Sequence, residues 1–119
     1  MKKITMLKIY TSKKTDGIMN LVNVSWSGLN IFKPYEGYEN DAKLVKEGSI
    51  HAETLFRKYR DHMRLSYDNN NRLWNWFLNQ NILIFGCDCN LGDLCHANFL
   101  AKRIFTKLGA DYIGEFPNV

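Results

Sequence analysis

The sequence contains no long hydrophobic run and no recognisable secretory leader. Its longest apolar stretch, ILIFGC at residues 82–87, is far shorter than the roughly 20 residues that a membrane-spanning helix needs. The first residues, MKKITMLKIY, begin with a basic segment, but Lys8 interrupts the apolar stretch and no small-residue cleavage site follows. We therefore expect no membrane partner and a cytoplasmic protein, in a bacterial cell or in a phage-infected host.

The sequence has few cysteines, and their number is odd. The 3 cysteines among 119 residues do not make the even set of a small disulfide-rich domain. In the cytoplasm, cysteines are usually free thiols, metal ligands or redox-active groups. All of them lie between residues 87 and 95, and His96 follows directly. The sequence therefore predicts that this segment marks a site rather than a covalent cross-link.

The sequence also lacks a strong excess of charge. Its net charge of +4 favours anionic partners without requiring them, and a dedicated nucleic-acid binder usually has a denser basic stripe. We expect a small anionic molecule as the partner, and nucleic acid is the least supported alternative. The apolar share of 45% and the charged share of 24% are typical of a globular domain.

Strand-like and helix-like segments alternate along the chain. Apolar and β-branched runs predict strands at residues 6–12, 18–26, 81–87 and 110–116. Apolar spacings of three and four predict helices at residues 49–66, 72–80 and 93–108, with Ser49 and Asp93 as caps. Residues 27–40, rich in glycine and aromatics, are expected to form a structured loop. This order predicts a single α/β domain over residues 1–119, a small Rossmann-like three-layer domain with a mostly parallel sheet of about four strands.

Polar and sulfur-bearing side chains follow the predicted strands where each strand ends. In an open parallel sheet, ligands bind beyond the carboxyl ends of the strands, and the amino end of a helix favours an anion. We therefore expect a pocket for a small anionic, nucleotide- or nucleoside-like ligand at these ends and at the start of the 93–108 helix. Its expected ligand-binding residues are Thr11, Ser12, Ser25, Cys87, Cys89 and, from the 49–66 helix, Arg64. The glycine-rich spacing of a phosphate loop is absent.

Cys95 and His96 are the candidate catalytic residues, although the residues leave open whether the protein is an enzyme. The field of the helix amino end is expected to lower the pKa of the Cys95 thiol. His96 would transfer a proton. Adjacent residues on a helix project about 100° apart, so a base hydrogen-bonded to Cys95 would come from elsewhere, such as His51 or His62.

A metal site is an alternative interpretation of the same segment. A tetrahedral zinc ion could be bound by three cysteines and one histidine, here Cys87, Cys89, Cys95 and His96. Their spacing, however, is not that of paired Cys-x-x-Cys knuckles. Cys87 could instead pack as a small hydrophobic residue on a buried strand. A separate hypothesis is a non-catalytic interaction or sequestering protein, phage-encoded in one version, whose cysteine cluster is structural or zinc-bound. Its contact surface would be the aromatic loop with Phe32, Tyr35 and Tyr38.

Three segments resemble the bacterial and phage proteins grouped as domain of unknown function 488. They are the initial KIYTS, the predicted helix ending YRDHMRLSY, and ILIFGCDCNLGDLCHANFLAKRIFTKLGADYIGE. In that family an apolar strand leads into a Cys-x-Cys or Cys-x-Glu segment, and Cys-His-Arg then opens a helix. The resemblance covers the first strand and the last third of the chain well, and the middle loosely.

This resemblance implies a Rossmann-like α/β fold and a pocket, with no particular activity. Carried over by position, the family's pocket residues fall on Cys87 or Cys89, Cys95, His96, Tyr10, Thr11 and Ser12. Ala97 stands where the family usually has arginine. If that arginine holds an anion in the family, the contact is lost here or is supplied by Arg64 or Arg103.

Overall fold

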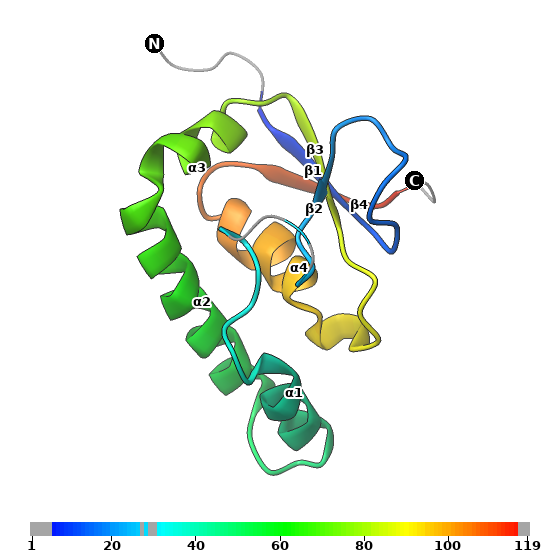
Figure 1. Ribbon diagram of the computed structural model, residues 1–119, viewed down its shortest axis with the longest axis vertical. Coiled ribbons are helices and arrows are strands. Elements are labelled where there is room, and N and C mark those ends of the chain that lie inside the picture. Colours follow the sequence, from blue (N-terminus) through cyan, green and yellow to red (C-terminus); the bar gives the residue numbers. More distant parts are fainter. Residues whose placement is uncertain (1–5, 27, 29–30, 117–119) are drawn as a thin grey trace.

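The computed structural model describes residues 6–26, 28 and 31–116. Figure 1 shows the sheet with the long helices to one side of it. In chain order the elements are β1 (Lys8–Ser12), β2 (Leu21–Asn23), α1 (Tyr38–Lys46), α2 (Ala52–Asn69), α3 (Asn71–Leu78), β3 (Ile82–Gly86), η1 (Gly92–Leu94), α4 (His96–Phe99), η2 (Leu100–Phe105) and β4 (Asp111–Glu115). The segment η1 is a 3-10 turn, and η2 continues α4 as a π-helix.

The four strands form one sheet in the order β2-β3-β1-β4, and every pair is parallel. Ser12 of β1 pairs with Gly86 of β3, and Asn23 of β2 pairs with the same glycine. The carboxyl ends of these three strands are therefore level. The α/β class and the parallel sheet predicted from the sequence are confirmed.

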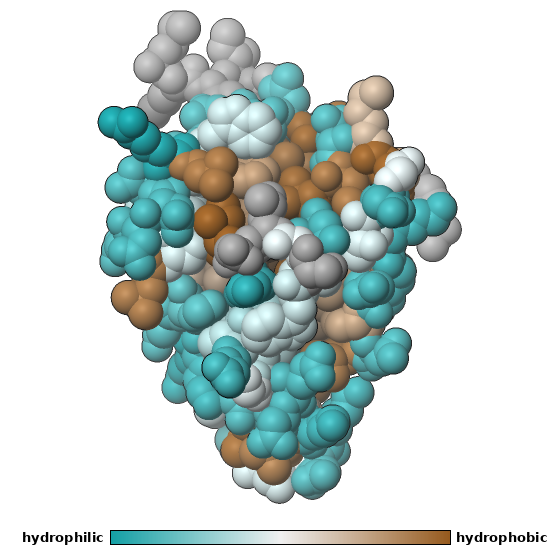
Figure 2. Space-filling view, in the orientation of Figure 1, coloured by the Kyte–Doolittle hydropathy of each residue, from teal (hydrophilic) through white to brown (hydrophobic). Residues whose placement is uncertain are grey.

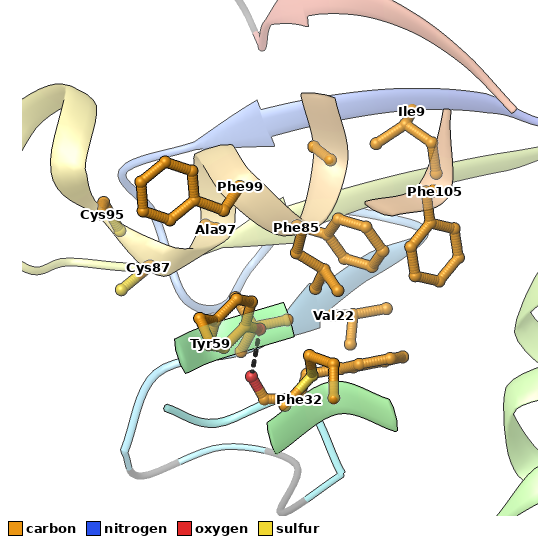
Figure 3. Close-up of a cluster of buried hydrophobic side chains, with 14 of the residues drawn as sticks. Ile9, Val22, Phe32, Tyr59, Phe85, Cys87, Cys95, Ala97, Phe99 and Phe105 are labelled. Atoms are coloured by element: carbon orange, nitrogen blue, oxygen red, sulfur yellow. Dashed lines mark hydrogen bonds between the residues drawn. The ribbon is translucent and has the colours of Figure 1, made fainter. Parts of the chain in front are cut away.

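One face of the sheet packs against the helices. Leu83 and Phe85 of β3 are buried on this face, and Phe32 lies among the rings of the helix layer. The ring of Phe32 has its centroid within 6 Å of four other aromatic rings, those of Trp74, Phe77, Phe85 and Phe105. The hydroxyl of Tyr59 donates to the carbonyl of Phe32 at 2.7 Å inside this cluster (Figure 3). This aromatic core holds β3 and η2 together.

The opposite face of the sheet is crossed by the irregular segment 13–20, which connects β1 to β2. A Cβ atom added to Gly86 would lie 2.1 Å from the carbonyl oxygen of Lys14, so this backbone passes directly over the glycine. Ile84 points to the same face as Gly86, because side chains alternate along a strand, and it is only 3% exposed. The third layer of the domain is therefore irregular rather than helical.

The outer surface has both hydrophobic and hydrophilic regions (Figure 2). Figure 2 shows hydrophobic residues gathered in the upper part of one face, around the sheet and α3, and a mostly hydrophilic surface over α2. The longest helix is α2, with 18 residues. Within the described part of the chain, no helix combines the length and the apolar character needed to cross a membrane.

The prediction of a loop over residues 27–40 is wrong at its end, because α1 begins at Tyr38. Tyr38 and Ala42 lie one helical turn apart and are both fully buried. Tyr38 packs edge-on against the rings of Tyr59 and His96. Tertiary burial of this face stabilises a helix that the local sequence pattern does not indicate.

The aromatic loop is also not the exposed contact surface that the alternative hypothesis predicted. Phe32 and Tyr38 are 0% exposed, and Tyr35 is half-buried with its hydroxyl donating to Asp41 at 2.6 Å. Large aromatic side chains bury the most apolar area, and here they do so against α2 and the sheet.

Three predicted elements differ from the observed ones by three residues at an end. The second strand is confined to β2, α2 begins at Ala52 rather than at Ser49, and the predicted 93–108 helix is divided. Asp93 lies in η1, and Cys95 has extended backbone (φ −61°, ψ 134°), so α4 starts only at His96. The extended backbone of Cys95 separates η1 from α4, and its sulfur is directed back toward the end of β3, as described below.

Candidate metal centre

Cys87 directly follows β3 and is held by the backbone. Its N–H donates to the carbonyl of Ser12 at 3.0 Å, while the preceding Gly86 accepts from Val24 at 2.9 Å. The side chain is 3% exposed. The end of the sheet thus fixes the first of the three sulfurs.

Two short turns return the chain from Cys89 to Cys95. The N–H of Leu94 donates to Leu91 at 3.1 Å and that of Cys95 to Gly92 at 3.0 Å, with Gly92 in the left-handed region at φ 58°. The hydroxyl of Tyr38 donates to the Leu94 carbonyl at 2.5 Å and ties the second turn to α1. The loop is therefore held in place at both ends.

The three sulfurs converge. The Sγ atoms of Cys87, Cys89 and Cys95 all lie within 4.8 Å of one another, and all three residues are free thiols. Cys87 and Cys95 are buried, and Figure 3 shows them at one end of the core cluster. A tetrahedral zinc with Zn–S bonds of about 2.3 Å places sulfurs about 3.8 Å apart. One soft cation would therefore need only small shifts of these side chains.

The proximity of the thiols also distributes their charge unequally. Hydrogen bonds from the thiols of Cys87 and then of Cys95 lower the pKa of Cys89 to about 2. The hydrogen bond to Cys89 raises the pKa of Cys87 to about 11. The pKa of Cys95 is raised by the hydrogen bonds to Cys87 and Cys89 and by burial. Negative charge therefore resides on Cys89, and the prediction of a lowered Cys95 pKa is wrong, because its neighbours are sulfurs rather than a bare helix end.

His96 is buried and turned toward the backbone. Its Nε2 lies 2.5 Å from the carbonyl oxygen of Val24, and burial lowers its pKa, so the ring is neutral with its proton on Nε2. Neither ring nitrogen belongs to the group of sulfurs that lie within 4.8 Å of one another. The structure therefore does not bring His96 into the predicted zinc set. His62, one of the predicted bases, contacts the ring of Tyr35 instead.

Within the described part of the chain, two cavities adjoin the cysteines. We call them the β2 cavity and the β1 cavity. The β2 cavity, of about 200 Å³, is lined by Ser25, Trp26, Pro34, Tyr38, Glu39, Cys87, Asp88, Cys89, Leu91 and His96. The β1 cavity, of about 240 Å³, is lined by Thr11, Ser12, Lys13, Cys87, Gly92, Asp93, Cys95, Ala97, Asn98, Lys102 and Glu115. Cys87 belongs to both, so the predicted site residues surround the cysteines in two adjoining spaces rather than in one.

The predicted hydroxyl residues help to hold the strand ends. Thr11 Oγ1 is hydrogen-bonded to the hydroxyl of Tyr112 at 2.8 Å, and Ser12 Oγ accepts from the backbone of Lys14 at 3.1 Å. Ser25 Oγ donates to the side chain of Asn23 at 2.6 Å. These hydrogen bonds position the cavity walls, and the same hydroxyl groups are polar groups that a ligand could contact.

Arg64 does not join the other predicted residues. It lies on α2, 3.6 Å from Asp61, beside a groove of about 580 Å³ between α2 and η2. Arg103 lines the same groove and forms a bidentate pair with Glu53 at 2.9 Å. Among the described residues, Lys13 and Lys102 instead line the β1 cavity together with Cys87 and Cys95. Lys13 directly follows the first strand, so the strand-end rule applied one residue further would have included it.

Comparison of the chain with protein-family models, with curated proteins and with solved structures finds no match. The resemblance to the domain of unknown function 488 family stays a prediction from the sequence.

Proposed function

We propose that this protein binds one thiophilic divalent cation, zinc foremost, through Cys87, Cys89 and Cys95. The observation that carries this proposal is the convergence of all three Sγ atoms to within 4.8 Å. Thiolate sulfur is a preferred ligand of zinc, and the lowered pKa of Cys89 makes one donor a thiolate before any ion arrives. An ion displaces the protons of the other two thiols, so its affinity rises with pH.

The bound ion would join three separate parts of the fold. Cys87 directly follows β3, Cys89 lies in the loop, and Cys95 precedes α4. A metal here closes the loop over residues 87–95 and fixes the start of α4. Because the folded state presents the sulfurs together, binding energy becomes folding energy.

The test is native mass spectrometry of freshly purified, reduced protein, compared with its denatured mass. We expect an excess of about 65 Da, the mass of one zinc, that is lost in Cys87→Ser, Cys89→Ser and Cys95→Ser. Asp93→Asn is the matched control, since Asp93 lies on the same loop and outside the sulfur group, and it should keep the ion. A bare chain mass, together with no thermal stabilisation on adding zinc to reduced protein, would contradict the proposal.

A second candidate function is the binding of a small anionic, nucleotide- or nucleoside-like molecule. The phosphate group of such a molecule would lie in the β1 cavity, because this cavity lies at the carboxyl ends of β1 and β3 and has Lys13, Lys102 and the Asn98 amide on its walls. The test is isothermal titration of metal-free protein with adenosine monophosphate and with inorganic phosphate. Heat that saturates for the nucleotide and is lost in Lys102→Gln would support it, and no heat for either probe would remove it.

We also propose that the resemblance to the domain of unknown function 488 family holds at the Cys/His segment. Its support is positional, since Cys87 follows a buried strand and Cys95 and His96 stand at the start of a helix. Metal content and ligand binding of a family member measured in the same way would test this.

A further inference from the structure

A tetrahedral ion held by three sulfurs has one coordination position left, and the ligand for it can be sought in the whole sequence. The chain has three cysteines, and all three are already used. The residues outside the described part, 1–5, 27, 29–30 and 117–119, include no Cys, His, Asp or Glu. Among the described residues, no His, Asp or Glu offers an atom that joins the sulfur group. The described part of the chain thus supplies three ligands to such an ion.

We infer that the fourth position is kept for an exogenous small anion, which reaches the ion through the β1 cavity beside Lys13 and Lys102. This inference rests on the proposed metal site and assigns that site its ligand class. A structural zinc site is closed by four protein ligands, whereas a site with three protein ligands and one open position is the arrangement of reactive or ligand-binding centres.

The charges around the cysteines decide which side an anion approaches. A divalent cation with three thiolates carries a net charge of −1, so a further anion is repelled unless cations lie near. Lys13 and Lys102 line the β1 cavity, together with the carboxylates of Asp93 and Glu115. The β2 cavity contains the carboxylates of Glu39 and Asp88, and no Lys or Arg is among its described lining residues. The β1 cavity is therefore the less repulsive route.

The lysines are also placed to move toward a ligand. Lys13 and Lys102 are exposed, and the Nζ of Lys102 lies 5.3 Å from the ring centroid of Tyr112, without a carboxylate partner in the described part of the chain. The β1 cavity has about 240 Å³, below the roughly 300–1,000 Å³ of typical pockets for larger organic ligands. Its size suits an anion of a few heavy atoms.

The experiment uses the reduced full chain loaded with cobalt(II), whose visible absorption reports coordination by thiolates and changes when a ligand changes. We expect an intense tetrahedral spectrum on adding cobalt. Titration with azide, and separately with inorganic phosphate, should shift these bands and saturate. Neutral imidazole should do so more weakly than azide.

Charge reversal of the lysines tests the route. In Lys13→Glu and Lys102→Glu, the apparent affinity for azide should fall about 3- to 10-fold, the effect of one reversed charge at a partly solvated site. Lys14→Glu is the matched control, because Lys14 is exposed, adjacent to Lys13 and outside the lining of the β1 cavity. Its azide affinity should change less than the affinities of the other two.

The outcomes separate the inference from the proposed function. No cobalt spectrum in the parent chain would overturn the metal site itself. A cobalt spectrum that neither anion alters would show a closed centre and would overturn only the inference. The inference also fails if His96→Gln, Asp88→Asn or Asp93→Asn alters the anion-free spectrum, since a protein group would then be the fourth ligand. Preference for imidazole, or equal losses in Lys14→Glu, would refute the anionic class or the route.

Discussion

Replacement of Gly86 by alanine is expected to be among the most destabilising single-methyl additions in this chain. The new Cβ would lie 2.1 Å from the Lys14 carbonyl oxygen and 3.2 Å from Cδ2 of Leu21. The first contact is with backbone, which cannot rotate away as a side chain can. Either the segment over the sheet or the end of β3 must move.

The magnitude follows from what such a movement disturbs. Overpacking a well-filled site costs about 1–3 kcal/mol. Moving the end of β3 also weakens two backbone hydrogen bonds, Val24 N–H to Gly86 at 2.9 Å and Cys87 N–H to Ser12 at 3.0 Å, each contributing about 1 kcal/mol. We expect a loss of about 3–5 kcal/mol, a large share of the 5–15 kcal/mol typical of a domain.

The assay is urea-induced unfolding followed by circular dichroism at 25 °C, on reduced and metal-free protein. Gly48→Ala is the matched control. Gly48 has φ 81° and nothing within 4 Å of its added Cβ, so this variant bears only the left-handed backbone strain of about 1–2 kcal/mol. If Gly86→Ala loses no more free energy of unfolding than Gly48→Ala, the close passage of segment 13–20 over the sheet is refuted.

Further predictions concern the site and the core. In metal-free protein, Cys89 should react with iodoacetamide before Cys87 and Cys95 at pH 6, because its lowered pKa keeps it a thiolate; peptide mass mapping would show this, and equal labelling of all three would contradict it. Tyr59→Phe should cost about 1–3 kcal/mol in urea unfolding, since it leaves the Phe32 carbonyl without its hydroxyl donor in the core. Burial raises the pKa of Tyr59 well above its ordinary value, so its contribution to stability is present below about pH 10 and is lost as the pH rises above it, where the unfolded tyrosine ionises first. The Tyr59→Phe variant should therefore lose less stability than the parent chain between pH 9 and 11, and an identical loss would count against this cause.

Local sequence patterns predicted the structure correctly where residues adjacent in sequence determine which side chains are buried. The continuously apolar run before Cys87 predicted β3, and the strand-end rule brought Thr11, Ser12 and the cysteines to one edge of the sheet, where the structure has them. The apolar spacing of Leu55, Tyr59 and Met63 likewise predicted the buried side of α2.

Local sequence patterns failed to predict the structure where contacts between segments distant in the sequence determine it. The α1 helix depends on Tyr38 packing against Tyr59 and His96, which lie far along the chain. The orientation of His96 toward the Val24 carbonyl, and the pKa of Cys95, depend on neighbours that no sequence spacing reveals.

The sequence alone determined the α/β class, the parallel sheet and the position of the cysteines after the third strand, because strand and helix periodicity and the position of residues after a strand are properties of adjacent residues. Only the tertiary structure decided that three sulfurs converge while His96 turns to the backbone, and that Lys13 and Lys102 rather than Arg64 lie beside them. Side-chain direction is set by packing across layers, and packing across layers is a property of the folded chain.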